Sequence, residues 1–107
     1  MEKIKRLIFS LGIRSTYQGF HYLCYALMLC LQDENYLLSV YKYLYTDVAE
    51  HFNVSRDSVD HCLRTVVSAC WYRGNRDLLI KLSGYNLTQK PTNGEFIDIL
   101  YQALVST

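Results

Sequence analysis

The sequence predicts an all-α fold, a compact bundle of about six helices, and three observations carry that prediction. Apolar residues recur along the chain at the spacing of a helix that buries one face. No segment alternates polar and apolar residues over a useful length, so no sheet is expected. Half of the residues are hydrophobic and only one is proline, which is typical of a folded helical domain. A chain of 107 residues has room for one core, so residues 1–107 are expected to form a single domain.

The first two helices can be placed by their apolar spacing and their end signals. The first is short, ends at Gly12 and has an apolar face formed by Ile4, Leu7, Ile8 and Leu11. The second is expected to be capped by Ser15 or Thr16 and to run to about Leu31. A polar connector over residues 32–35 follows it. Helical spacing then resumes over residues 36–44 and is expected to bend at residues 45–47.

The stretch over residues 48–62, VAEHFNVSRDSVDHC, predicts a helix-turn-helix. Its first helix has one apolar face, and the small Ala49 on that face permits a close approach of the second helix. Asn53 stands at the turn, where the chain needs a left-handed conformation that Asn tolerates better than most residues. Ser55 is a good N-cap for the second helix. An ordinary structural hairpin is the alternative, but it seldom combines a small residue, a turn-permissive Asn and a cap at these offsets.

The second helix of this motif is expected over about residues 56–72, with a buried stripe of Val59, Cys62, Leu63, Val66, Ala69 and Cys70. It is expected to stop at Gly74, because glycine commonly ends a helix in a left-handed conformation. Residues 77–82 form a short helix and residues 85–92 a loop. Thr92 or Asn93 caps the last helix, with Glu95 in its first turn and an apolar face of Phe96, Ile97, Leu100 and Leu104.

The exposed face of the second helix is expected to meet the major groove of double-stranded DNA. The candidate base readers are Ser58, Asp60, His61, Arg64 and Thr65. Among them Arg64 is the strongest, because a guanidinium pairs bidentately with guanine O6 and N7, while Asp60 would have to accept from a cytosine amine. The candidate phosphate contacts are Ser55, Arg56, Ser68, Lys90, Thr92 and Asn93. A solvated helix face that never meets DNA is the alternative for the same residues.

The amino-acid composition and the spacing of particular residues argue against several other classes of function. The net charge of +1 is low for a nucleic-acid binder, so phosphate contacts would have to come from a local basic patch. The four cysteines lack the spacing of a zinc site and lie among apolar residues, which indicates buried thiols in a reducing cytoplasm. Residues 19–31 are apolar but too short to cross a bilayer, and no membrane partner is expected. The histidines are scattered and no phosphate loop is present, so neither an enzyme, a metal nor a cofactor is expected.

Four strings of residues make this chain similar to a known family: LYTDVAEHFNVS from Leu44, Trp71 with Arg73-Gly74-Asn75, Gly84-Tyr85, and KPTNGEFI from Lys90. Over nearly its whole length, and more loosely before residue 40, the chain resembles the C-terminal DNA-binding effector domain of the sporulation response regulator (stage zero sporulation protein A) family. The resemblance implies a six-helix fold, head-to-tail homodimers on repeated DNA elements, and contact with RNA polymerase sigma factors.

The chain also departs from the family pattern. The family usually has arginine where Ser58 and His61 stand, and histidine at Thr65, whereas Arg64 and the acidic Asp60 match. The short helix before Gly84 is more apolar here. The family protein also carries a receiver domain, and the first residues of this chain look like a natural start, so a stand-alone effector without a receiver is expected. The alternative function is a degenerate helix-turn-helix that pairs with, or antagonises, a full-length regulator.

Overall fold

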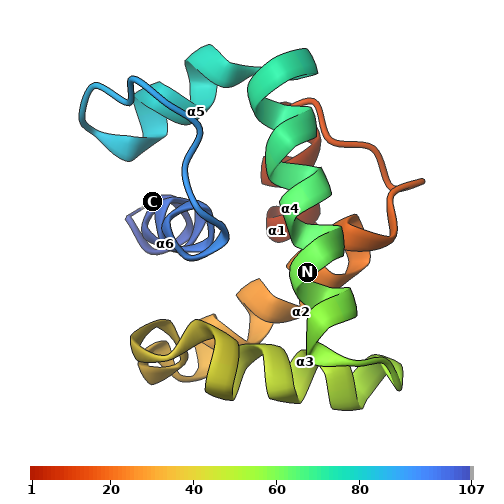
Figure 1. Ribbon diagram of the computed structural model, residues 1–107. Helices are drawn as coiled ribbons and strands as arrows, with labels where there is room; N and C mark the ends of the chain where they lie inside the picture. The colour runs from red at the N-terminus through yellow and green to blue at the C-terminus, as the bar shows by residue number, and fades with distance from the viewer. Residues whose placement is uncertain (107) are drawn as a thin grey trace.

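The computed structural model describes residues 1–106, and every regular element over that range is a helix (Figure 1). Its α-helices are α1 (Glu2–Ser10), α2 (Gln18–Gln32), α3 (Tyr45–Phe52), α4 (Arg56–Arg73), α5 (Arg76–Ser83) and α6 (Asn93–Val105). Between α2 and α3 lie a 3₁₀ helix, η1 (Glu34–Leu38), and a π-helix, η2 (Val40–Leu44). The all-α prediction is therefore confirmed. None of the helices within residues 1–106 has both the length and the apolar character needed to cross a membrane.

Helix α4 is the central element, and it packs against α2, α3, α5 and α6. Figure 1 shows it in front of α1, with α3 crossing its N-terminal end and α5 following its C-terminal end. The closest approach is to α2 at Gly19, where an added Cβ would lie 2.3 Å from the Cys62 carbonyl oxygen and 2.6 Å from Val66 Cγ2. Only a residue without a side chain fits between the two helices at this point.

The end of α4 lies equally close to the N-terminal loop. This contact, rather than a left-handed conformation, explains why a glycine stands at position 74. Gly74 has φ −104° and ψ −150°, so it is not the left-handed residue expected at a helix end. Its hydrogen atoms face the chain before α2: an added Cβ would lie 2.5 Å from the Leu11 carbonyl oxygen. The Asn75 N–H donates to that same oxygen at 2.9 Å. Gly12, at φ 80°, does adopt the left-handed conformation and ends α1 as expected.

The cap expected for α2 was wrong. The helix begins at Gln18, with Tyr17 as its N-cap and no side-chain hydrogen bond there. Ser15 and Thr16 lie outside it because a turn closes first, through the Tyr17 N–H donating to the Arg14 carbonyl at 3.2 Å. The Ser15 carbonyl oxygen is engaged by the His21 ring, whose Nε2 lies 2.9 Å away.

The expected helix over residues 36–44, and the bend after it, were also wrong. Ser39, at φ −151°, separates η1 from η2, and the Asp33 side chain caps η1 by accepting from the Asn35 N–H at 3.0 Å. Helix η2 then continues into α3 without a break, because Leu44 keeps a right-handed helical conformation. The wider π turn allows the consecutive side chains of Leu44 and Tyr45 both to be buried, at 0% and 2% exposure.

The end of α5 and the start of α6 lie where the sequence predicts them. Gly84 ends α5 at φ 78°, in the left-handed region. Thr92 caps α6 in a reciprocal arrangement: its Oγ1 accepts from the Glu95 N–H at 3.2 Å, and Glu95 Oε1 accepts from the Thr92 N–H at 2.8 Å. The expected face of α6, with Phe96, Ile97, Leu100 and Leu104, is buried.

The contact at Gly19 leads to a test of the packing. We expect Gly19→Ala to lower the free energy of unfolding by about 1–3 kcal/mol, because the added methyl group meets backbone atoms that have no room to move. Gly94→Ala is the matched control. Its Cβ would meet only Val40 Cγ2, at 3.7 Å, so it should leave stability unchanged or raise it slightly. Urea unfolding followed by circular dichroism measures both, and equal midpoints for the two variants would contradict the packing described.

Candidate nucleic-acid interface

The turn between α3 and α4 has the conformation that the sequence predicts. Asn53 lies at φ 57° and ψ 49°, the only residue other than glycine with a positive φ within residues 1–106. The next N–H, that of Val54, donates to the Ala49 carbonyl at 2.9 Å. Ser55 caps α4 by accepting from the Ser58 N–H at 3.0 Å. Since Val48 and Ala49 are buried at the junction, α3 is held against α4 in the arrangement expected of a helix-turn-helix.

The buried face of α4 agrees with the expected stripe, with three differences. Val67 and Trp71 are buried as well, and Cys62 is only half-buried. Trp71 is covered by Arg76, whose guanidinium carbon lies 5.2 Å from the ring centroid. On the opposite face Ser58, His61, Arg64 and Thr65 are exposed, and Ser68 is half-buried. Helix α4 therefore presents a continuous polar face along most of its length.

Arg64 is held in place by residues from another helix. Its guanidinium pairs with the Asp60 carboxylate one turn earlier, while 65% of the Arg64 side chain stays exposed. Asp60 is itself fixed by Asn93, whose side-chain amide donates to the Asp60 carbonyl at 3.1 Å and to its Oδ1 at 3.2 Å. Tyr45 lines the same depression as these three residues, and burial raises the pKa of its hydroxyl to about 12. The structure thus joins Asp60, Arg64 and Asn93, and it leaves Ser58, His61 and Thr65 beside them on the exposed face.

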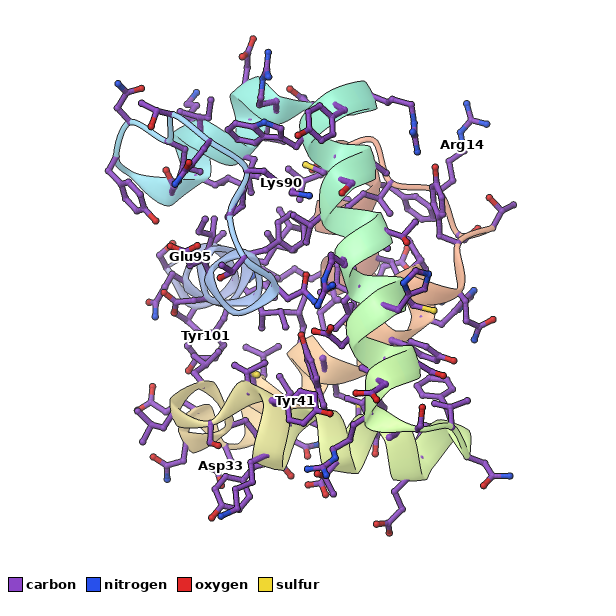
Figure 2. The ribbon with its side chains drawn as sticks, viewed as in Figure 1. Arg14, Asp33, Tyr41, Lys90, Glu95 and Tyr101 are labelled. Atoms are coloured by element: carbon purple, nitrogen blue, oxygen red, sulfur yellow. The ribbon has the colours of Figure 1, made fainter. Side chains whose placement is uncertain are left out.

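Lys90 and Ser68 are also brought together. Lys90 Nζ donates to Ser68 Oγ at 3.0 Å and lies 5.8 Å from the centroid of the Tyr72 ring. Figure 2 shows Lys90 beside α4, on the side of the loop that leads to α6. Tyr72 was missed by the sequence reasoning, although the signal was present: it follows Ser68 by four residues, on the same face, and 68% of it is exposed.

Near the start of α4, the candidate phosphate contact Arg56 packs on Tyr41, which in turn binds Asp57. The Arg56 guanidinium carbon lies 4.9 Å from the centroid of the Tyr41 ring. The Tyr41 hydroxyl donates to Asp57 Oδ1 at 2.7 Å, and this hydrogen bond raises the pKa of Tyr41. Thr92 is exposed, but its N–H already donates to Glu95, so only its hydroxyl hydrogen is left to donate to a phosphate.

Carboxylates are concentrated in one segment of the sequence. Residues 31–50 carry four carboxylates and one lysine, so the rest of the chain has a net charge of +4 against +1 for the whole. A shallow depression beside α4 is lined by His61, Arg64, Thr65, Ser68, Arg73 and Lys90. No carboxylate is among these residues. Arg73 was not among the sequence candidates because it is remote in sequence from the start of α4.

The chemistry of this surface is that of binding. Serine and threonine hydroxyls, an imidazole, two guanidinium groups and an ammonium group face solvent together, and these groups bind phosphates and base edges. In the part of the chain that the structure describes, no three His, Cys, Asp or Glu side chains gather as metal ligands. Burial raises the pKa of both Cys30 and Cys70 to about 11, so these two thiols are protonated at neutral pH.

The sequence over residues 4–104 matches the model of a protein family described as Sporulation initiation factor Spo0A C terminal. The match runs from α1 to the last turn of α6. It therefore includes the turn at Asn53, the whole of α4 and the segment from Lys90 to Asn93. It also confirms the resemblance seen in the sequence, and it extends through residues 4–40, where the similarity was looser.

The left-handed turn gives a test of the motif. We expect Asn53→Ala to lower the free energy of unfolding by about 1–2 kcal/mol, because an alanine side chain is strained at φ 57°. Asn53→Gly, which adopts this conformation freely, should cost less than Asn53→Ala. Urea midpoints at an unchanged m-value provide the measurement. If the alanine variant were at least as stable as the glycine variant, the assigned turn conformation would be wrong.

Proposed function

The chain belongs to the family of sporulation initiation factor Spo0A C-terminal domains, which are DNA-binding effector domains, and from this premise we propose that it is a sequence-specific transcription regulator. In this proposal the N-terminal half of α4 enters the major groove of double-stranded DNA. The reading residues are Ser58, His61, Arg64 and Thr65, while Asp60, whose two carboxylate oxygens are engaged by Arg64 and Asn93, orients Arg64. With DNA as its partner, the protein would act in the cytoplasm.

The observation that carries the proposal is the chain of contacts from Asn93 through Asp60 to Arg64. A guanidinium that pairs with guanine O6 and N7 must be aimed, because its two donors meet two acceptors in one plane. Asp60 aims Arg64, and Asn93 fixes Asp60 from α6. The Arg64 side chain is still 65% exposed, so it is available to a base while it is oriented.

The phosphate contacts follow from the surrounding donors. Lys90 supplies a positive charge beside Ser68, and Ser55 and Arg56 stand at the first turn of α4, where the helix dipole favours an anion. At the start of α6 the Thr92 hydroxyl can donate to a phosphate, whereas the Asn93 side-chain amide donates to Asp60. Contacts of this kind fix the position of a protein on the duplex, whereas the exposed stripe of α4 selects the sequence. With Ser58, His61 and Thr65 in place of the family's longer basic side chains, we expect this chain to recognise a different DNA sequence.

The protein partners are part of the same proposal. By its family, the chain would bind repeated DNA elements as a head-to-tail homodimer and would contact an RNA polymerase sigma factor through the region of α5. Residues 1–107 would act as one effector domain. The proposal of these two partners rests on the family alone.

A second candidate function, a protein-interaction module, is favoured by one surface feature. Leu38 is 84% exposed and Tyr43 is 56% exposed, and both line a depression with Asp33 and Asp47. A large apolar side chain that packs against little in its own chain is more typical of a contact surface than of a DNA reader. This module would pair with, or antagonise, a full-length regulator.

Salt-dependent binding separates the two candidates. We expect the purified chain to enrich a motif from a randomised duplex pool, and Arg64→Ala to lose about 1–3 kcal/mol of discrimination between that motif and a variant with its guanine replaced. Fluorescence anisotropy at two salt concentrations measures the affinities. Arg6→Ala is the matched control, because Arg6 is an exposed arginine on α1.

Two results would contradict the DNA proposal. One is the absence of binding at low salt, which would favour the interaction module. The other is an Arg64→Ala variant that discriminates as well as Arg6→Ala does, which would show that Arg64 does not read a base and would remove the observation on which the proposal rests.

A further inference from the structure

We propose that the loop over residues 11–17, together with Arg73, forms a second phosphate clamp that holds the DNA strand opposite to the one held by Lys90. The inference rests on the proposed function, since it assumes that α4 lies in a major groove. The contacts assigned so far, apart from the first turn of α4, come from the α6 side. The structure has a second basic cluster on the other flank.

The two flanks of α4 follow from its helical period. With about 3.6 residues per turn, Asp60, Arg64 and Val67 fall on one side of the exposed face, and Cys62, Ala69 and Arg73 fall on the other. The depressions follow this division except at Arg73, which stands at the end of the helix and lines a depression on each side. Asp60, Arg64 and Val67 share a depression with the segment from Lys90 to Gly94, whereas Ala69 and Arg73 share one with Gly12, Arg14, Thr16 and Tyr17.

Arg14 and Arg73 are the positively charged residues that line the depression on this second flank of α4. Both are exposed, and Arg73 also lines the depression that contains His61, Arg64 and Lys90. No carboxylate lines the depression that Arg14 and Arg73 share. Figure 2 shows Arg14 on one side of α4 and Lys90 on the other.

The loop is held rigidly for this role. At one end its backbone is fastened to the end of α4, through Asn75 N–H and the Leu11 carbonyl at 2.9 Å. At the other end Arg73 donates to the Tyr17 hydroxyl at 2.8 Å. The His21 ring holds the Ser15 carbonyl between these points. A clamp that is ordered before binding loses little conformational entropy when it meets a phosphate.

The dimensions of DNA place a phosphate backbone near each flank of a helix in the major groove. The major groove is about 12 Å wide, and an α-helix with its side chains is about 10–12 Å across. A helix that enters the groove is therefore bordered by both phosphate backbones. In this proposal Lys90 reaches one of them and Arg14 reaches the other, with the Ser15 and Thr16 hydroxyls beside Arg14 as further donors and Arg73 at the end of the helix between the two flanks.

The test uses the full chain and a duplex that the wild-type chain enriches from a randomised pool. We expect Arg14→Ala to weaken binding equally for all sequences and to make the slope of log affinity against log salt shallower by about 0.9. Arg14→Lys should restore most of that slope. Arg6→Ala is again the matched control, and circular dichroism melting shows that each variant is folded.

Neutral methylphosphonates, placed one at a time on each strand, locate the contact. Wild-type affinity should fall for substitutions on both strands. Arg14→Ala should lose its sensitivity on one strand only, and Lys90→Ala on the other. If Arg14→Ala matches Arg6→Ala in slope and in strand sensitivity while Arg64→Ala still loses discrimination, the second clamp is wrong and the proposed function stands. If the wild-type chain does not bind the duplex at low salt, the proposed function fails and the clamp fails with it.

Discussion

The close approach of α2 to α4 at Gly19 is the constraint on which the rest of the structure depends. Because no side chain separates the two helices there, the Cys62 carbonyl and Val66 lie directly against the α2 backbone. This contact determines which face of α4 is buried, and the opposite face then carries Ser58, His61, Arg64 and Thr65 into solvent. The second close contact, between Gly74 and Leu11, fixes the far end of α4 in the same way. Helix α4 is therefore a rigid element with one free face.

Part of this structure was predictable from the sequence, because some residues act only on their neighbours in the chain. Asn53 and Ser55 act through their own backbone neighbours, so their residue types were sufficient to place the turn and the cap. The buried stripe of α4 followed from helical period alone. The π turn before α3 was not predictable, because its cause is the burial of Leu44 and Tyr45 in a core built by other helices. Gly74 was placed at the right position for the wrong reason, since its role is a tertiary contact.

The candidate interface, too, was only partly predictable from the sequence. The residue types along α4 indicated the reading stripe, but nothing local could show that Asn93, thirty-three positions later, holds Asp60. Arg14 and Arg73 are far apart in sequence and meet only because the N-terminal loop returns to the end of α4. The net charge of +1 was a poor guide as well, because the carboxylates of residues 31–50 conceal the basic character of the remainder. Segregated charge allows a nearly neutral protein to approach DNA with one face.

The central claim is that the free face of α4 meets DNA, and an amide NMR titration with a short duplex tests it most directly. The account predicts that the largest chemical-shift changes fall on residues 55–68 and 90–93. Residues 33–39, which line no depression with α4, should change little. Changes confined to residues 33–39, or none at low salt, would contradict the claim and would indicate that this surface of α4 serves another purpose.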